Sequence, residues 1–541
     1  MNTNNKMTCG QALIKLLEQY QVETVFGIPG VHTLDLYKGL NGSSINHVLT
    51  RHEQGAGFMA DGYARITGKP GVCFTITGPG VTNIATAVGQ AYSDSIPMLV
   101  ISSVNNRESL GKGRGELHET KDQRAIMAPI TELSATACEP DQVPGLIAQA
   151  FSIFSRQRPR PVFIEIPLDV MSSVVEESWH IAPPSHNRFD SQLSKNNALF
   201  NASAALLTDA KYPVIIAGGG AISAADEVQQ LAEQLGAAVF TTVAAKGLLP
   251  VKHPLYAGST LCVAPSWQYI RGADVVIAIG TELSETDIWC EKLPIKGQLI
   301  RIDIDPNKLD DLYPAKVAIL SDAKSALNEL LDAIADVPAS EIAPSADALI
   351  ALKSTIISDL DPLQVAHKCV LDIVQHVLPS HAFVSTDMTQ LAYTGNFTFN
   401  VNQPRSWFHP AGYGTLGYAL PAAIGAKYAA ADRPGLVIVG DGGILYTIQE
   451  LATATEEISS PLVVLLWNND SLGQIRDDMV AQGIEPIGVS PKNPDYLKLA
   501  QGFGCNTYQP DSIEKLSIDL SAAFEYQGVT LILVNQSITT L

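Results

Sequence analysis

The feature that most constrains the fold is a series of short, branched apolar runs that recur between helical patterns along the whole chain. They include "CFTIT", "MLVIS" and "VFIEI" early on, "PVIIAGG", "DVVIAIG" and "LIRIDID" in the middle, and "LVIVG", "LVVLLWNN" and "LILVN" near the end. Short runs that are apolar at nearly every position are typical of strands covered on both faces. Their alternation with helices predicts α/β domains with doubly wound parallel sheets.

Two polar stretches divide the chain. Met171–Ala198 is polar with little periodicity, and Ala335–Ala348 is rich in Pro, Ser and Ala. They predict three domains within the 541 residues, at 1–175, 190–335 and 355–541. This division agrees with the usual domain size of about 150–200 residues.

The first and third domains carry a similar pattern. "TITGPGVTNIATAVGQAYSDSIPMLVIS" and "VIVGDGGILYTIQELATATEEISSPLVVLLW" each run strand, glycine turn, helix, proline, strand. Any two βαβ units share some of this pattern, but we expect two related domains that flank a Rossmann-like middle domain. The repeat aligns Pro79 with Asp441, so only the second copy has an acid at the glycine turn.

Composition excludes several classes of protein. The formal net charge of −20 argues against nucleic acid binding. No apolar run reaches membrane-spanning length, the first residues lack a signal-peptide core, and the seven cysteines include no C-x-x-C pair. A cytoplasmic location is therefore the simplest expectation. The phosphate loop of nucleotide hydrolases, the zincin helix and the G-x-S-x-G elbow are all missing from the sequence.

The strongest chemical signal is the acid in "IVGDGG" (Ile438–Gly443), which follows a strand. The next strand ends in "NNDS", at Asn469 and its neighbours. Carboxyl ends of parallel strands meet at one edge of a sheet, so Asp441 and Asn469 are expected to lie close together. Their oxygens suit Mg²⁺, which typically completes its shell with phosphate oxygens. The alternative is a helix-capping acid beside a turn asparagine.

This spacing of G-D-G and N-N resembles the thiamin diphosphate motif of the acetolactate synthase/pyruvate decarboxylase superfamily. Further segments of similar appearance follow in the expected order along essentially the whole chain: "GIPG" (Gly27–Gly30), "RHEQGAGFMADGYARITG" (Arg51–Gly68), "TGPGVTN" (Thr77–Asn83) and "GTLGYALPAAIGA" (Gly414–Ala426). The resemblance implies thiamin diphosphate and Mg²⁺, with the metal held by Asp441, Asn469 and the carbonyl of Ser471.

The resemblance also assigns roles. Glu53 matches the glutamate that hydrogen-bonds N1′ of the cofactor pyrimidine and so promotes loss of the thiazolium C2 proton. Leu416 matches the bulky apolar residue that props the cofactor in its bent shape. Further expected cofactor contacts are Pro29, Gly30, Gly414, Thr415, Gly440, Gly442, Gly443 and Asn469. The plainer alternatives are a surface glutamate and a core leucine. In this family the site lies between two chains, which implies a homodimer or a dimer of dimers.

Departures from the family pattern concern FAD. Acetolactate synthases that bind FAD usually carry a Met-His-Gly segment in the middle domain, where this chain has "AGSTLCVAPSW" (Ala257–Trp267). The arginine of their "RFDD"-like segment is replaced within "GTELSETDIW" (Gly280–Trp289), and the tryptophan expected after N-N is missing from "GQIRDDM" (Gly473–Met479). We therefore expect no FAD.

Histidines and carboxylates suggest the reaction. Pyruvate decarboxylase-type enzymes carry a His-His pair where this chain has His118 and Glu119, and His32 follows "GIPG". We take His32 and His118, with Glu119 beside them, as candidate proton-handling groups, although surface histidines are the alternative. The segments "GIPGVHTLDLYKGL", "GELHETKDQ" and "AGYGTLGYALPAAIGA" look most like the 2-ketoarginine (5-guanidino-2-oxopentanoate) decarboxylase group. A guanidinium substrate requires carboxylates; the candidates are Glu116, Glu119, Asp477 and Asp478.

The resemblance therefore implies non-oxidative decarboxylation of a small 2-oxo acid to an aldehyde and CO₂, with 5-guanidino-2-oxopentanoate as the candidate substrate. One alternative is an acetolactate synthase-type carboligase, which delivers a second carbonyl compound where the decarboxylase delivers a proton. Another is a binding protein on an inactive scaffold, which the joint presence of Glu53, Asp441 and Asn469 argues against.

Overall fold

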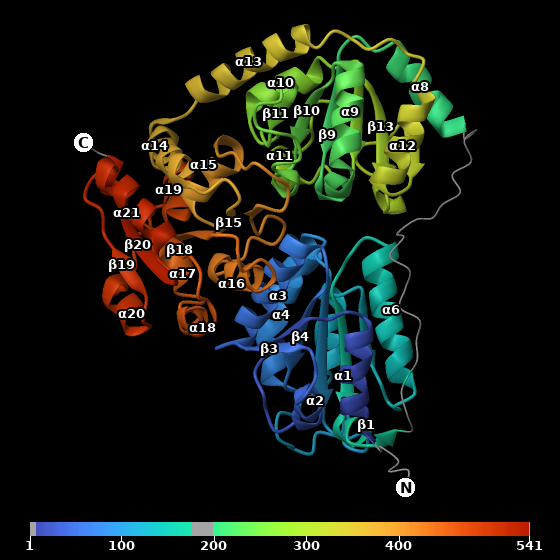
Figure 1. Cartoon of the computed structure of the whole chain (residues 1–541), viewed down its shortest axis with the longest axis vertical. Helices are drawn as coiled ribbons and strands as arrows, with labels where there is room; N and C mark the ends of the chain where they lie inside the picture. The colour runs from blue at the N-terminus through green and yellow to red at the C-terminus, as the bar shows by residue number, and fades with distance from the viewer. Residues whose placement is uncertain (1–6, 176–178, 180–197, 540–541) are drawn as a thin grey trace.

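The computed structural model describes residues 7–175, 179 and 198–539, which form three parallel six-stranded sheets with helices packed around them (Figure 1). This confirms the predicted α/β class. Most of the first predicted linker, Met171–Ala198, lies outside the described residues. The exact domain limits of 1–175, 190–335 and 355–541 stay a prediction. Within the described ranges, no helix is long and apolar enough to cross a membrane.

The N-terminal sheet has the strand order β3-β2-β4-β5-β7-β6, with all neighbours parallel. Its strands are β2 (Thr24–Gly27), β3 (Asn46–Leu49), β4 (Gly71–Thr75), β5 (Met98–Val104), β6 (Leu133–Thr136) and β7 (Val162–Pro167). Its helices are α1 (Cys9–Gln19), α2 (Leu34–Leu40), α3 (Glu53–Thr67), α4 (Pro79–Ser93), α5 (Gln123–Met127), α6 (Gln142–Arg156) and α7 (Leu168–Met171). A short antiparallel pair, β1 (Met7–Thr8) with β8 (Val174–Val175), joins the two ends of this domain.

The middle sheet has the order β11-β10-β9-β12-β13-β14. Its strands are β9 (Pro213–Ala217), β10 (Ala238–Thr241), β11 (Tyr256–Gly258), β12 (Val275–Ile279), β13 (Gln298–Asp303) and β14 (Val317–Leu320). Its helices are α8 (Ala198–Thr208), α9 (Ala225–Leu235), α10 (Ala264–Arg271), α11 (Glu285–Ile288) and α12 (Ala323–Ala333). The second predicted linker is partly helical, because α13 (Ala343–Ser358) begins inside it and packs apolar side chains such as Leu349 into the middle domain.

The C-terminal sheet has the order β16-β15-β17-β18-β20-β19. Its strands are β15 (Phe383–Thr386), β16 (Trp407–Phe408), β17 (Gly435–Gly440), β18 (Leu462–Asn468), β19 (Asn506–Tyr508) and β20 (Val529–Asn535). Its helices are α14 (Pro362–Val377), α15 (Gln390–Thr398), α16 (Ala419–Ala429), α17 (Asp441–Ile444), α18 (Glu450–Glu457), α19 (Gly473–Ala481), α20 (Tyr496–Gly502) and α21 (Ile513–Glu525). The central strands β17 and β18 are almost completely buried, as their unbroken apolar sequence predicts.

The two outer domains share the predicted repeat, with one difference. Pro79 begins α4, and Asp441 begins α17, so the two glycine turns occupy equivalent places after a strand. The helix that follows is continuous in the first copy. In the second copy it is interrupted between α17 and α18, where a single helix was expected. This interruption creates a separate helix start at Glu450.

Helices α3 and α16 hold the first and third domains together and lie side by side in Figure 1. Their backbones approach so closely that side chains are excluded at two glycines. A Cβ on Gly62 would lie 1.9 Å from the carbonyl oxygen of Ala422, and one on Gly425 would lie 1.9 Å from that of Met59. The glycines in these two segments therefore serve helix packing.

We predict that Gly425→Ala destabilises the protein, because the helices must separate to accept a methyl group. Overpacking of this kind costs about 1–3 kcal/mol, and the melting temperature should fall. Gly145→Ala in α6 is the matched control, since no atom lies within 4 Å of its added Cβ. Alanine is the better helix former there. Equal melting temperatures for the two variants would contradict the packing described here.

Candidate active site

The carboxyl edge of the C-terminal sheet brings the predicted metal ligands together. Strands β17 and β18 are parallel neighbours in which Gly440 lies opposite Trp467. Asp441 directly follows β17, and Asn469 directly follows β18. The strand register thus places these two side chains at adjacent strand ends.

Asp441 is buried in an oxygen-rich setting. One carboxylate oxygen accepts a 2.7 Å hydrogen bond from the Asn493 side-chain amide, and the other accepts one from the N–H of Gly442. The same Asn493 nitrogen also donates to side-chain oxygens of Asn468 at 2.9 Å and Asp470 at 3.1 Å. Burial raises the pKa of Asp441, and nearby Asp470 adds to the rise. Three oxygens thus converge on one electropositive group.

Asn493 was not predicted from the sequence, because it lies in a loop far along the chain with no motif to mark it. Among the residues that the structure describes, no three His, Cys, Asp or Glu side chains gather into a metal-binding group. A cation at this edge would therefore need amide and carbonyl oxygens in addition to carboxylates.

Asn469 and Ser471 form a tight turn after β18. The Asn469 side-chain oxygen accepts the N–H of Ser471 at 3.1 Å, while the buried Ser471 hydroxyl donates to the carbonyl of Val489. The Asn469 amide reaches Gln390, whose own amide donates to Asp477 at 3.0 Å. Gln390 therefore connects the predicted metal ligand to a predicted substrate carboxylate.

Asp387 fixes the turn that carries Leu416. Its two oxygens accept the N–H groups of Gly417 and Ala419, each at 3.1 Å. Burial raises the pKa of Asp387 to about 6, although these N–H donors act in the opposite direction. A Cβ on Gly443 would lie 3.0 Å from Asp387 and 3.7 Å from Leu416. The "GTLG" turn is thus packed against the "GDGG" turn. Asp387 matches no motif and was not predicted from the sequence.

Thr415 and Gly414 join this turn to the N-terminal domain. Gln90 on α4 accepts hydrogen bonds from the N–H and the hydroxyl of Thr415. Gly414 has φ +67°, a left-handed conformation that favours glycine. At Gly440 the restriction is steric, since a Cβ there would lie 3.0 Å from the Thr389 hydroxyl. The backbone of these turns is therefore held tightly in place.

The carboxyl edge of the N-terminal sheet positions Glu53. This residue begins α3, is 9% exposed, and accepts a 2.9 Å hydrogen bond from Asn83 in the first turns of α4. His118 lies at the same end of α4, because a Cβ on Gly78 would meet the His118 carbonyl oxygen at 2.4 Å. Glu53 and His118 are therefore gathered at one helix end.

His32 and His118 form a pair. Their ring centroids lie 5.2 Å apart with the planes nearly perpendicular. In each ring the buried Nδ1 has no hydrogen-bond partner among the described residues. Burial lowers the pKa of His32, and His118 lowers it further. Exposed Pro29 and half-buried Gly30 form the turn just before His32.

Glu119 has a different environment from the histidines. Its carboxylate accepts the N–H groups of Arg114, Gly115 and Glu116 and thereby holds the loop together. The Glu116 carboxylate accepts the hydroxyl of Ser109, and that of Asp478 accepts the amide of Gln474. Of the four candidate substrate carboxylates, Asp477 is the one connected to Asn469 through a third residue.

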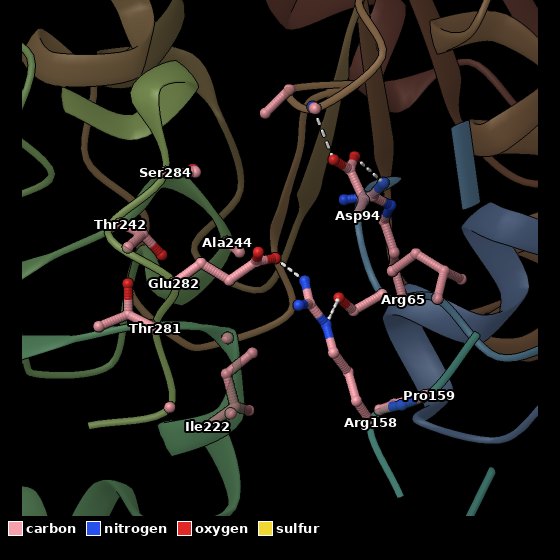
Figure 2. A pocket seen from close by; sticks show the side chains of 18 of the residues that line it. Arg65, Asp94, Arg158, Pro159, Ile222, Thr242, Ala244, Thr281, Glu282 and Ser284 are labelled. Carbon is pink, nitrogen blue, oxygen red and sulfur yellow. Dashed lines mark hydrogen bonds and ion pairs between the residues drawn. The ribbon is translucent and has the colours of Figure 1, made fainter. Parts of the chain in front are cut away.

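A cavity of about 580 Å³ is lined by residues of all three domains, including Arg158, Glu282 and His409, but by neither Glu53 nor Asp441. It lies at the carboxyl ends of β9 and β12, the point in the middle sheet at which the strand order reverses. Figure 2 shows Arg158, from the N-terminal domain, reaching across it to pair with Glu282. Lys308 binds the same glutamate at 2.9 Å. An ion-pair network therefore crosses this cavity.

Three family models match the chain in order. They are the N-terminal thiamine pyrophosphate (TPP) binding domain at residues 7–126, the central domain at 200–330 and the C-terminal TPP binding domain at 387–534. The chain belongs to the thiamine pyrophosphate enzyme family. This confirms the predicted superfamily and the thiamin diphosphate-binding nature of the outer domains.

The chain is also similar to individual proteins of this family over most of its length. The chain is 58% identical to a probable 2-ketoarginine decarboxylase, AruI, of Pseudomonas aeruginosa, over 98% of this chain and 94% of that protein. It is 33% identical to the acetolactate synthase isozyme 1 large subunit of Escherichia coli, over 94% and 90%. It is 31% identical to a probable acetolactate synthase large subunit of Methanocaldococcus jannaschii, over 94% and 89%. The chain therefore covers most of the length of these three relatives.

Proposed function

We propose that this thiamine pyrophosphate enzyme is a Mg²⁺-dependent decarboxylase that converts a 2-oxo acid, 5-guanidino-2-oxopentanoate in particular, to an aldehyde and CO₂. The observation that carries the proposal is the meeting of Asp441, Asn469 and the Leu416 turn at one sheet edge. The similarity to the probable 2-ketoarginine decarboxylase supports the substrate.

The residues at the C-terminal edge fit a metal-bridged diphosphate. Asp441 supplies a carboxylate oxygen, Asn469 an amide oxygen and Ser471 a backbone carbonyl, which are ligands that Mg²⁺ accepts. The oxygens that surround the Asn493 amide support the idea that positive charge is stabilised here. Gly442 and Gly443 have no side chain that would keep a phosphate group away from this turn.

The N-terminal edge fits the activation step. Bound thiamin diphosphate supplies the electron sink for CO₂ loss. In our proposal Glu53 shares a proton with the pyrimidine nitrogen, and Leu416 packs against the ring system. The unpartnered Nδ1 atoms support His32 and His118 as the groups that move a proton at the substrate. Glu119 holds the loop at residues 114–116, next to His118.

The assembly follows the family pattern in this proposal. We infer that two chains form each site, so that Glu53 of one subunit serves the metal edge of another, in a homodimer or a dimer of dimers. We also infer a cytoplasmic enzyme that acts on a free small molecule.

A carboligase of acetolactate synthase type is the second candidate. The relatives that are 31–33% identical over almost the whole chain favour it. It would use the same cofactor residues and differ in the compound that arrives after CO₂ has left.

We propose that the enzyme carries no FAD. In support, the ion pairs of Glu282 with Arg158 and Lys308 cross the cavity at the carboxyl end of the middle sheet, where a dinucleotide would be expected to bind. Purified protein should release no yellow chromophore on denaturation. A stoichiometric flavin in the supernatant would overturn this proposal and favour the carboligase.

The metal assignment predicts that Asp441→Ala weakens thiamin diphosphate binding, because the diphosphate loses the anchor of its bridging cation. Loss of a charged interaction of about 1.5–3 kcal/mol corresponds to roughly 10- to 100-fold in Kd. Calorimetry with and without Mg²⁺ measures it. Asp495→Ala, an exposed helix cap nearby, is the control. Unchanged, Mg²⁺-dependent affinity in Asp441→Ala would refute the assignment.

The substrate assignment predicts that 5-guanidino-2-oxopentanoate outcompetes pyruvate and that Asp477→Asn reduces this preference. A charge-assisted bond to guanidinium contributes about 1.5–3 kcal/mol. This corresponds to roughly a 10- to 100-fold change in the ratio of kcat/KM for the two substrates. Asp478→Asn, one residue further along α19, should leave the preference unchanged. If pyruvate alone reacts and acetolactate is the product, the carboligase candidate replaces the decarboxylase.

A further inference from the structure

Glu450 is a carboxylate with 0% exposure at the first position of α18. Its two oxygens accept the backbone N–H of Arg51 at 3.1 and 3.2 Å, and one of them accepts the hydroxyl of Thr453 at 2.8 Å. Burial raises the pKa of Glu450, and the N–H groups of Arg51 and His52 lower it. A buried carboxylate of the C-terminal domain is thus used to bind backbone of the N-terminal domain.

The bound backbone is the turn that presents Glu53. This turn leads from β3 into α3, which begins at Glu53. Helix α18 approaches it at two further points: the Thr453 hydroxyl, which donates to Glu450, lies 3.4 Å from the carbonyl oxygen of Leu49, and Glu456 pairs with the Arg51 guanidinium. Together these contacts hold the end of β3, at Leu49, and the turn that follows it, at Arg51.

Gly55 shows how closely the carboxylate fits. A Cβ on Gly55 would lie 2.4 Å from a Glu450 oxygen, so the first turn of α3 can accept this carboxylate only without a side chain there. The glycine in "RHEQGAG" therefore has a packing partner in the C-terminal domain. The Glu450 carboxylate therefore lies against the backbone on both sides of Glu53, at Arg51 and at Gly55.

We propose that Glu450 is a positioning residue that acts through Glu53: it fixes the turn at Arg51 and His52 so that the Glu53 carboxylate points at the cofactor pyrimidine. The inference rests on the activating role of Glu53 in the proposed function. Misplacement of a catalytic group by about 1 Å can cost about 100-fold in rate. Loss of the buried acceptor would release two backbone N–H groups and permit such a shift.

A double-mutant cycle of Glu450→Gln and Glu53→Gln tests this inference. Glu450→Gln keeps one acceptor oxygen but turns an amide donor toward the N–H groups. It should slow C2–H exchange in bound thiamin diphosphate by about 10- to 100-fold, with cofactor Kd within about threefold of wild type. Glu53→Gln should slow exchange by about 10²–10⁴-fold. The double variant should be no slower than Glu53→Gln alone.

Two further variants complete the design. Thr453→Val removes one hydroxyl from Glu450 without changing side-chain shape and should slow exchange by about two- to tenfold. Glu227→Gln is the matched control, a buried glutamate of the middle domain paired with Lys324, and should exchange at the wild-type rate. Melting temperatures of all variants show whether the fold is intact.

The outcomes separate the inference from the proposed function. If Glu53→Gln is slow and the effect of Glu450→Gln multiplies with it, Glu450 acts independently and the inference fails alone. If Glu53→Gln exchanges at the wild-type rate, the activating role of Glu53 fails, and the inference fails with it. If Glu450→Gln does not fold, wild-type exchange in a folded Thr453→Val protein overturns the inference.

Discussion

The parallel pairing of β17 with β18 is the constraint on which the proposed site depends. This pairing places the ends of two buried strands beside each other. A polar residue, Asp441 or Asn469, directly follows each strand. Parallel strands need a crossover between them, and here α17 and α18 provide it. Asp441 begins this crossover, and Glu450 and Glu456 in its second helix contact Arg51 of the N-terminal domain. The proposed cation ligand and these interdomain contacts therefore belong to one continuous segment.

Contacts between the outer domains of one chain then fix the turns that carry the other site residues. Asp387 holds the Leu416 turn against the glycine turn, and Gln90 holds Thr415 from the N-terminal domain. The close crossing of α3 and α16 brings the outer domains together, and Glu450 contacts the turn before Glu53. The domain proposed to bind the cation thus also supports Glu53 of its own chain, which in the proposed dimer serves the cation site of the other subunit.

Sequence reasoning worked where the signal is local. Unbroken apolar strands predicted the three parallel sheets, and the spacing of Asp441 and Asn469 placed them at adjacent strand ends. It was less successful where the signal depends on tertiary packing. Asp387 and Asn493 have no motif, because their partners lie 30 and 52 residues away. The start of α13 inside a predicted linker reflects burial of Leu349 against the middle domain, which composition does not reveal.

The proposed function requires that Asp441, Asn469 and Ser471 bind the cation that bridges to the cofactor diphosphate. Anomalous diffraction from crystals grown with thiamin diphosphate and Mn²⁺ in place of Mg²⁺ would locate this cation. We expect one manganese peak per chain at about 2.0–2.3 Å from the Asp441 carboxylate, the Asn469 amide oxygen and the Ser471 carbonyl. A manganese peak elsewhere, with the cofactor bound and these oxygens uncoordinated, would contradict it.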